Sequence, residues 1–279
     1  MNRNFQKPCV LFVSQEIFPF VSESEISITS RQLIQFLYEC NMEIRAFMPR
    51  YGMINERKYN LHDVIRLSGV NIIINDGDHP LFVKVASIPN TRMQVYFTDN
   101  EEFFSRKTLY HDEAGNFCPD NDERMVFYAR SVVETVKNLK WIPDIIHCHG
   151  WFTSLLPVMI RKAFVHEPQF AETKIIYSVY NDEFSETLNR DLPLKLKMDG
   201  LDGEDIKPYR NPTYSRIIKE AINWSDGIIL VSDKINRDIV RFSSGTNKPL
   251  LENPTADGFI DAYYTFYNEV LEGEAVLGE

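Results

Sequence analysis

Two histidines, His147 and His149, close a short apolar run that begins after Asp144. Continuous apolar runs of this length are typical of strands buried on both faces of a parallel sheet. Strand alternation places the two imidazoles on one side and Cys148 on the other. Ligands of open α/β sheets bind at the carboxyl ends of the strands, so both histidines are site candidates. A purely structural, hydrogen-bonded role is the alternative for each.

Other chemistries find less support in the sequence. His147-Cys148-His149 resembles a metal-binding run, but the cysteine faces away and no third ligand follows at a typical spacing. The chain has no Gly-x-Gly-x-x-Gly after its first apolar run, no Walker loop and no Gly-x-Ser-x-Gly elbow. We therefore expect neither a bound metal nor a cofactor.

Composition limits the partners. The 279 residues carry 40 acidic and 30 basic side chains, a net charge of −10, without a long run of either sign. This balance argues against a nucleic-acid or anionic membrane surface. The four cysteines are widely spaced and are interpreted as free thiols. The first eight residues lack a signal-peptide core, and no apolar run approaches the roughly 18 residues that span a bilayer. We expect a cytoplasmic protein with no membrane partner.

Alternating strands and helices must position the histidines. Asn75-Asp76-Gly77-Asp78 separates two β-rich stretches and predicts an antiparallel hairpin. The expected fold is α/β, with a doubly wound, mainly parallel Rossmann-like sheet and this hairpin as an insertion. Residues 100–121 are expected to form a long aromatic loop, and 184–211 has no clear period. The expected strands are 9–14, 43–48, 93–97, 145–149, 174–180 and 227–231, and the expected helices are 27–40, 123–140, 151–164, 212–224, 233–242 and 257–271.

Four blocks of the sequence have a recognisable order. Residues 10–20, 47–52, 144–153 and 229–232 resemble the amino-terminal half of bacterial glycogen synthases and plant starch synthases. The resemblance covers residues 8–245 and implies one half of a GT-B architecture, in which two Rossmann-like domains face a cleft. Residues 246–279 are interpreted as a linker and a docking helix, without the family's carboxyl-terminal donor domain. The resemblance implies transfer of glucose from ADP-glucose to the non-reducing end of an α-1,4-glucan.

In this family the amino-terminal domain mainly contacts the acceptor glucan. The resemblance assigns the catalytic role to His149, which matches the family histidine near the reacting sugar. It also implies substrate-binding roles for Glu16, Tyr51, Trp151, Thr153 and Asn181. The alternative interpretation of Trp151 is that it is a core residue, because large aromatics at helix starts are usually buried.

Departures from the family pattern concern the donor. The family loop Lys-Thr-Gly-Gly-Leu, which approaches the donor phosphates, reads Ser22-Glu23-Ser24-Glu25-Ile26 here. The lysine and both glycines are absent, and two carboxylates stand where an anion would bind at a helix N-terminus. The family's His-Asp-Trp-His becomes residues 149–152, His-Gly-Trp-Phe. We expect ADP-glucose to bind weakly or not at all.

Three hypotheses remain open from the sequence. The chain functions in glucan synthesis only when a separate glycosyltransferase chain supplies the donor domain, and is inactive in isolation. Alternatively, it is a non-catalytic glucan-binding or regulatory relative in glycogen metabolism. In the third hypothesis it is a protein-interaction scaffold, with homo-oligomers as one possible form.

Overall fold

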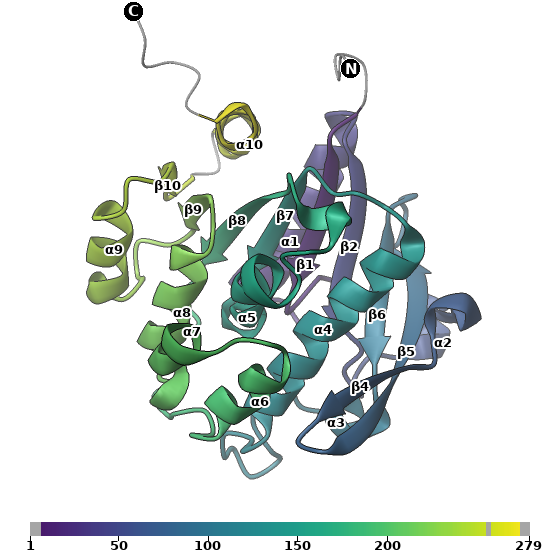
Figure 1. Ribbon diagram of the computed structural model, residues 1–279. Helices are drawn as coiled ribbons and strands as arrows, with labels where there is room; N and C mark the ends of the chain where they lie inside the picture. The colour runs from purple at the N-terminus through teal and green to yellow at the C-terminus, as the bar shows by residue number, and fades with distance from the viewer. Residues whose placement is uncertain (1–6, 255–257, 274–279) are drawn as a thin grey trace, which may run out of the picture.

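A single twisted sheet runs through the protein, and helices cover both of its faces (Figure 1). The computed structural model describes residues 7–254 and 258–273. The strand order across the ten-stranded sheet is β10-β9-β8-β7-β1-β2-β6-β5-β3, with β4 paired to β5 outside this path. This arrangement confirms the expected α/β class and the doubly wound topology.

Parallel strands form the larger part of the sheet. β1 and β7 pair directly at the centre of the sheet. From β1 the strand order continues through β2 to β6 on one side, and from β7 it continues through β8 to β10 on the other. This boundary is the topological switch point, where open α/β sheets bind ligands. The parallel strands are β1 (Cys9–Ser14), β2 (Glu43–Pro49), β6 (Gln94–Asp99), β7 (Ile145–His149), β8 (Lys174–Val179), β9 (Gly227–Leu230) and β10 (Leu250–Glu252).

The predicted antiparallel insertion is present at one edge of the sheet. The strands β4 (Val70–Ile74) and β5 (Gly77–Ser87) form a hairpin in which Ile74 pairs with Gly77. Its two turn residues, Asn75 and Asp76, have φ values of 48° and 60°. Two consecutive positive φ values are what a two-residue type I′ hairpin turn requires. β5 also pairs with β6 and with the short strand β3 (His62–Asp63).

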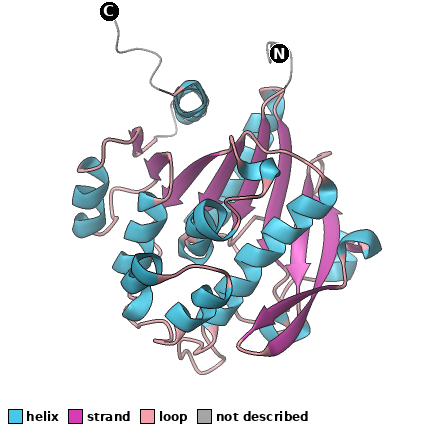
Figure 2. Cartoon of the chain, in the orientation of Figure 1, coloured by secondary structure: helices cyan, strands magenta, loops and turns pink. Residues whose placement is uncertain are grey.

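Two helical layers enclose the sheet (Figures 1 and 2). α4 (Asn121–Leu139), α5 (Leu155–Val158) and α8 (Tyr214–Asn223) lie in front in this view, and α1 (Glu25–Glu39) lies behind. α10 (Phe259–Glu272) packs beside α1 and against β9. The shorter helices are α2 (Glu56–Tyr59), α3 (Glu101–Phe104), α6 (Leu192–Met198), α7 (Gly203–Ile206) and α9 (Arg237–Ser244).

Several segments differ from the sequence-based expectation. The expected helix 151–164 is a 3₁₀ turn at Trp151–Thr153, then α5, then a π-helical turn at Met159–Ala163. The stretch expected as a loop at 100–121 contains α3, and 184–211 contains α6 and α7. α10 begins at Phe259, and the expected start at Asp257 lies outside the described residues.

The segment 246–279 contains more than a linker and a helix, because β10 pairs with β9 in the main sheet. Among the side chains of α10 that the structure describes, those of Tyr263, Phe266, Tyr267 and Val270 are buried. The Cβ of an alanine at Gly227, the first residue of β9, would lie 2.7 Å from Val270 and 3.0 Å from Phe266. The described part of this segment therefore packs on the sheet. The division into a domain at 8–245 and a separate tail at 246–279 stays a prediction.

Candidate functional site

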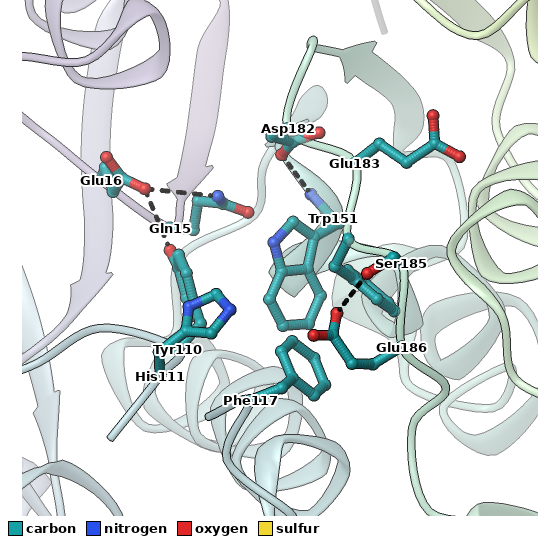
Figure 3. A pocket seen from close by; sticks show the side chains of 11 residues that line it. Gln15, Glu16, Tyr110, His111, Phe117, Trp151, Asp182, Glu183, Ser185 and Glu186 are labelled. Atoms are coloured by element: carbon teal, nitrogen blue, oxygen red, sulfur yellow. Dashed lines mark hydrogen bonds between the residues drawn. The ribbon is translucent and has the colours of Figure 1, made fainter. Parts of the chain in front are cut away.

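A pocket of about 280 Å³ opens where β1, β7 and β8 end (Figure 3). Its residues come from the segments that follow these three strands and from the aromatic stretch 105–120. It therefore lies at the switch point of the sheet. The lining residues are Gln15, Glu16, Tyr110, His111, Phe117, Trp151, Asp182, Glu183, Phe184, Ser185 and Glu186.

Glu16 is a buried carboxylate of this pocket, with 7% of its surface exposed. It accepts a hydrogen bond from the Ser24 hydroxyl at 2.6 Å and another from the Tyr110 hydroxyl at 3.2 Å. The amide of Gln15 lies 3.5 Å from the same carboxylate. These neutral donors hold the carboxylate in one position, so it is a preorganised acceptor for ligand hydroxyl or amino groups.

Aromatic rings also line the pocket. The ring centroid of Trp151 lies 4.9 Å from that of Tyr110 and 4.8 Å from that of Phe184. Phe117 stacks on Phe184 with centroids 4.9 Å apart. Mutually packed aromatic rings lose little conformational entropy when a ligand binds, and their faces suit the apolar face of a sugar ring. The site thus combines rigid apolar surface with fixed carboxylates.

Asp182 is a pocket residue that the sequence analysis did not select. Its carboxylate accepts from the Tyr214 hydroxyl at 2.6 Å and from the Trp151 backbone amide at 3.1 Å. Burial raises the pKa of Asp182 to about 7, and the nearby Glu16 adds to the increase. The position of Asp182 in the sequence could have indicated it, because Asp182 follows the end of β8 just as Glu16 follows the end of β1.

Gly150 packs closely against the pocket residue Gln15. Gly150 has a φ of 82°, and a Cβ at this position would lie 2.3 Å from Oε1 of Gln15. That oxygen accepts a hydrogen bond from the Phe152 amide at 2.9 Å. Gln15 thus occupies the space beside residue 150, where the family resemblance has an aspartate, and links the end of β1 to the end of β7.

His149 does not line the pocket and has no exposed surface. Its ring stacks on Phe12 at 4.1 Å, and its Nδ1 lies 2.9 Å from the Tyr180 hydroxyl. Its Nε2 has no hydrogen-bond partner among the described residues. Burial lowers the pKa of His149 well below 6.5, and the adjacent His147 lowers it further. His149 is therefore held neutral, and its catalytic role stays a prediction.

His147 is also fully buried and joins β7 to α10. Its Nδ1 lies 2.5 Å from the Tyr267 hydroxyl, and its Nε2 lies 2.7 Å from the Ser178 hydroxyl. Burial lowers the pKa of His147 from 6.5 to about 3. Both ring nitrogens have protein partners, so the contacts of His147 are those of a structural residue.

The other expected site residues are distributed unequally around the pocket. Glu16 and Trp151 line it, and Tyr51 is buried behind it, 3.3 Å from the Tyr110 hydroxyl. Thr153 is buried and donates to the Gly150 carbonyl at 2.8 Å. Asn181 is exposed beside Asp182. The structure thus brings two of the six predicted residues to the pocket surface, while their functional roles stay predictions.

The expected phosphate loop leads into α1. Ser24 caps the helix, and its hydroxyl accepts a hydrogen bond from the Ser27 amide at 3.0 Å. Ser27 returns the capping interaction to the Ser24 amide at 2.9 Å. Glu23 and Glu25 are exposed on either side. Serine side chains therefore already accept hydrogen bonds from backbone amides that an anion would otherwise bind at this helix N-terminus.

Metal centres and membrane spans are two further classes of site. Among residues 7–254 and 258–273, no group of three or more His, Cys, Asp or Glu side chains is arranged to hold a metal ion. Within the same ranges, no helix has the length and hydrophobicity needed to cross a bilayer.

Comparison with known proteins decides the family. Residues 9–252 match the family model of the starch synthase catalytic domain. The chain belongs to this family. A glycogen synthase of Chlorobium limicola is 39% identical over 180 residues, which are 64% of this chain and 36% of that protein. A glycogen synthase of Chlorobaculum tepidum is 37% identical over the same shares of the two chains. The alignments thus span about a third of the length of these curated relatives.

The fold has a solved counterpart. The catalytic domain of starch synthase IV from Arabidopsis thaliana, bound to ADP and acarbose, superimposes with a TM-score of 0.71 at 17% identity. The match covers 91% of this chain and 53% of that chain. This starch synthase family domain therefore has the Rossmann-like fold of one half of a GT-B glycosyltransferase.

Proposed function

We propose that this domain binds the acceptor α-1,4-glucan in a glycogen or starch synthase reaction. The observation that supports the proposal best is the pocket at the switch point, because two of its residues, Glu16 and Trp151, match the family's acceptor-side motifs. Fixed carboxylates can accept hydrogen bonds from sugar hydroxyls, and the aromatic rings can contact the sugar face. The resemblance to enzymes that extend glucans supplies the ligand class.

We further propose that glucose transfer needs a donor site outside the described residues. The capping of α1 by Ser24 and the carboxylates Glu23 and Glu25 disfavour a diphosphate at the expected loop. The resemblance places most donor contacts in the family's second domain. ADP-glucose should accordingly bind this chain more weakly than maltotriose. Calorimetry that gave a micromolar dissociation constant for ADP-glucose would contradict this part of the proposal.

A non-catalytic glucan-binding role is the second candidate, and the burial of His149 favours it. An imidazole can stabilise charge on a reacting sugar only if it reaches that sugar. If His149 stays buried when glucan binds, the domain binds carbohydrate without contributing this histidine to chemistry. Glucan elongation assays with a supplied donor-domain partner separate the two candidates, because only the first predicts product.

Titration with maltotriose tests the proposed binding. We expect roughly millimolar dissociation constants for the unaltered protein, as a small, partly polar pocket supports few strong contacts. Trp151→Phe and Glu16→Gln should each weaken binding at least about threefold, which corresponds to loss of one modest contact. Tyr38→Phe, an exposed aromatic outside the pocket, serves as the control. Equal affinity in all four proteins would contradict the proposed site.

A further inference from the structure

We propose that the pocket prefers a monosaccharide-sized ligand that carries a protonated amine over a neutral sugar of the same shape. The inference rests on the proposed function, because it assigns a ligand class to the same pocket. Three features support it: the charges of the lining residues, the neutral hydrogen-bond partners of Glu16 and Asp182, and the aromatic rings beside them.

Carboxylates outnumber the other ionisable groups that line the pocket, among which is the ring of His111. Four carboxylates line it, from Glu16, Asp182, Glu183 and Glu186, and no lysine or arginine is among the lining residues. Carboxylates that share a small, partly desolvated space repel one another. The repulsion between Glu16 and Asp182 contributes to the raised pKa of Asp182. A positive ligand would relieve this repulsion, whereas a neutral one would leave it unchanged.

Three aspartates with buried side chains elsewhere in the protein have cationic partners. Asp99 lies 2.9 Å from Arg50, Asp122 lies 2.6 Å from Lys195, and Asp199 lies 3.1 Å from Arg130. This pattern is general, since desolvated charges in proteins are usually paired.

Glu16 and Asp182 depart from that pattern. The hydrogen bonds that they accept come from neutral hydroxyl and amide donors. Neither carboxylate takes part in any ion pair found among residues 7–254 and 258–273. The pocket thus has one buried carboxylate, Glu16, and one half-buried carboxylate, Asp182, for which a bound cation would be the counter-ion.

The aromatic rings favour an organic cation over a metal ion. Trp151, Tyr110, Phe117 and Phe184 contribute to the same pocket. Aromatic faces attract ammonium groups, and the attraction increases when water is excluded. A metal ion would need several oxygen or nitrogen ligands arranged around one point, and the described residues contain no such group. An amine on a sugar can contact both the carboxylates and the rings.

Proton release provides an independent signature. The groups that face Asp182 are Glu16, the Trp151 amide and four tyrosine hydroxyls, from Tyr110, Tyr177, Tyr180 and Tyr214. Glu183, Glu186 and the titratable ring of His111 line the same pocket, and no lysine or arginine does. A bound ammonium would favour ionised Asp182, so binding should release a proton near neutral pH. Affinity should consequently rise from pH 6 to pH 8 for an amine that stays protonated over this range. A neutral sugar should not show this rise.

Two matched glucosides test the proposal: 2-aminoethyl α-glucoside and its N-acetyl derivative, which has no charge. Titrations by NMR at pH 7.5 should show about tenfold tighter binding of the amine, the size of one charge-assisted contact. Glu16→Gln and Asp182→Asn should reduce this ratio toward one. Glu204→Gln, which removes an exposed carboxylate outside the pocket, should retain it.

The outcomes separate this inference from the proposed function. Equal affinity for the two glucosides, together with maltotriose binding, would overturn the amine preference and leave the glucan site in place. Loss of binding for both glucosides and maltotriose would overturn both proposals. An amine preference that survives in Glu16→Gln and Asp182→Asn would show that the cation binds elsewhere, and would also overturn the inference.

Discussion

At the residue scale, Gly150 is the position where adding a single methyl group should most clearly destabilise the folded protein. We predict that Gly150→Ala lowers the free energy of unfolding by about 2–4 kcal/mol, because a positive φ and a 2.3 Å contact with Gln15 act together. Gly69→Ala is the matched control, since Gly69 has a φ of 92° and a Cβ added there would have nothing within 4 Å. Urea unfolding of both variants measures the difference. Equal losses of unfolding free energy in the two variants would contradict the prediction, because they would show that Gln15 can move aside without destabilising the fold.

The buried histidines predict a pH dependence of stability. Burial lowers the pKa of His147 to about 3 in the folded protein, so the unfolded chain binds the extra proton first as pH falls. The stabilisation is complete above the ordinary pKa of 6.5 and is lost progressively toward pH 3, by up to about 1.4 kcal/mol per pH unit. His147→Gln should therefore reduce the fall in unfolding free energy between pH 7 and pH 5. The exposed His62→Gln should not, and an unchanged slope in His147→Gln would contradict the account.

Residue roles at strand ends were only partly accessible from the sequence. Glu16 and Trp151 were found because they occupy recognisable motifs, and both line the pocket. Asp182 was missed because its importance depends on contacts with Tyr214 and Glu16 that are far away in the chain. The burial of His149 also depends on residues that are distant in the sequence, such as Tyr180. Strand periodicity indicates which face a side chain occupies but not what covers that face.

At the element scale, the contact between His147 and Tyr267 is expected to help hold α10 on the sheet. We predict that Tyr267→Phe lowers the free energy of unfolding by about 1–3 kcal/mol, because Nδ1 of His147 would be buried without a partner. Tyr264→Phe, on the exposed side of α10, should change it by less than about 0.5 kcal/mol. Hydrogen exchange should show faster exchange in α10 for the first variant. Unchanged exchange and stability would mean that apolar packing alone holds the helix.

The elements themselves were predicted best where the sequence is most apolar. β1, β7 and β8 appear as continuous apolar runs because both faces are covered, and each lies where it was expected. The short helices α3, α6 and α7 were missed because they have at most two turns and no usable period. The π-helical turn at Met159–Ala163 interrupts a segment whose composition suits an ordinary helix.

At the scale of the whole molecule, topology explains where the pocket lies. The chain places Gln15 after β1, Gly150 after β7 and Asp182 after β8, and parallel pairing brings these three points to one edge. The sequence therefore predicted a site at the end of the sheet where this pocket lies. The sequence also predicted an aromatic loop at 100–121, but it did not indicate that Tyr110 and Phe117 are the rings that line the pocket, because the path of this irregular segment depends on tertiary contacts.

The central claim is that a glucan binds between the carboxylates and aromatic rings of this pocket. The chain has three tryptophans, and only Trp151 lines the pocket. The three indole N–H signals in a ¹⁵N NMR spectrum therefore report on three separate places. We predict that maltotriose shifts the Trp151 signal in a saturable way and leaves those of Trp141 and Trp224 unchanged. A titration in which the Trp151 signal stays fixed up to tens of millimolar maltotriose, well above the roughly millimolar affinity expected, would contradict the account.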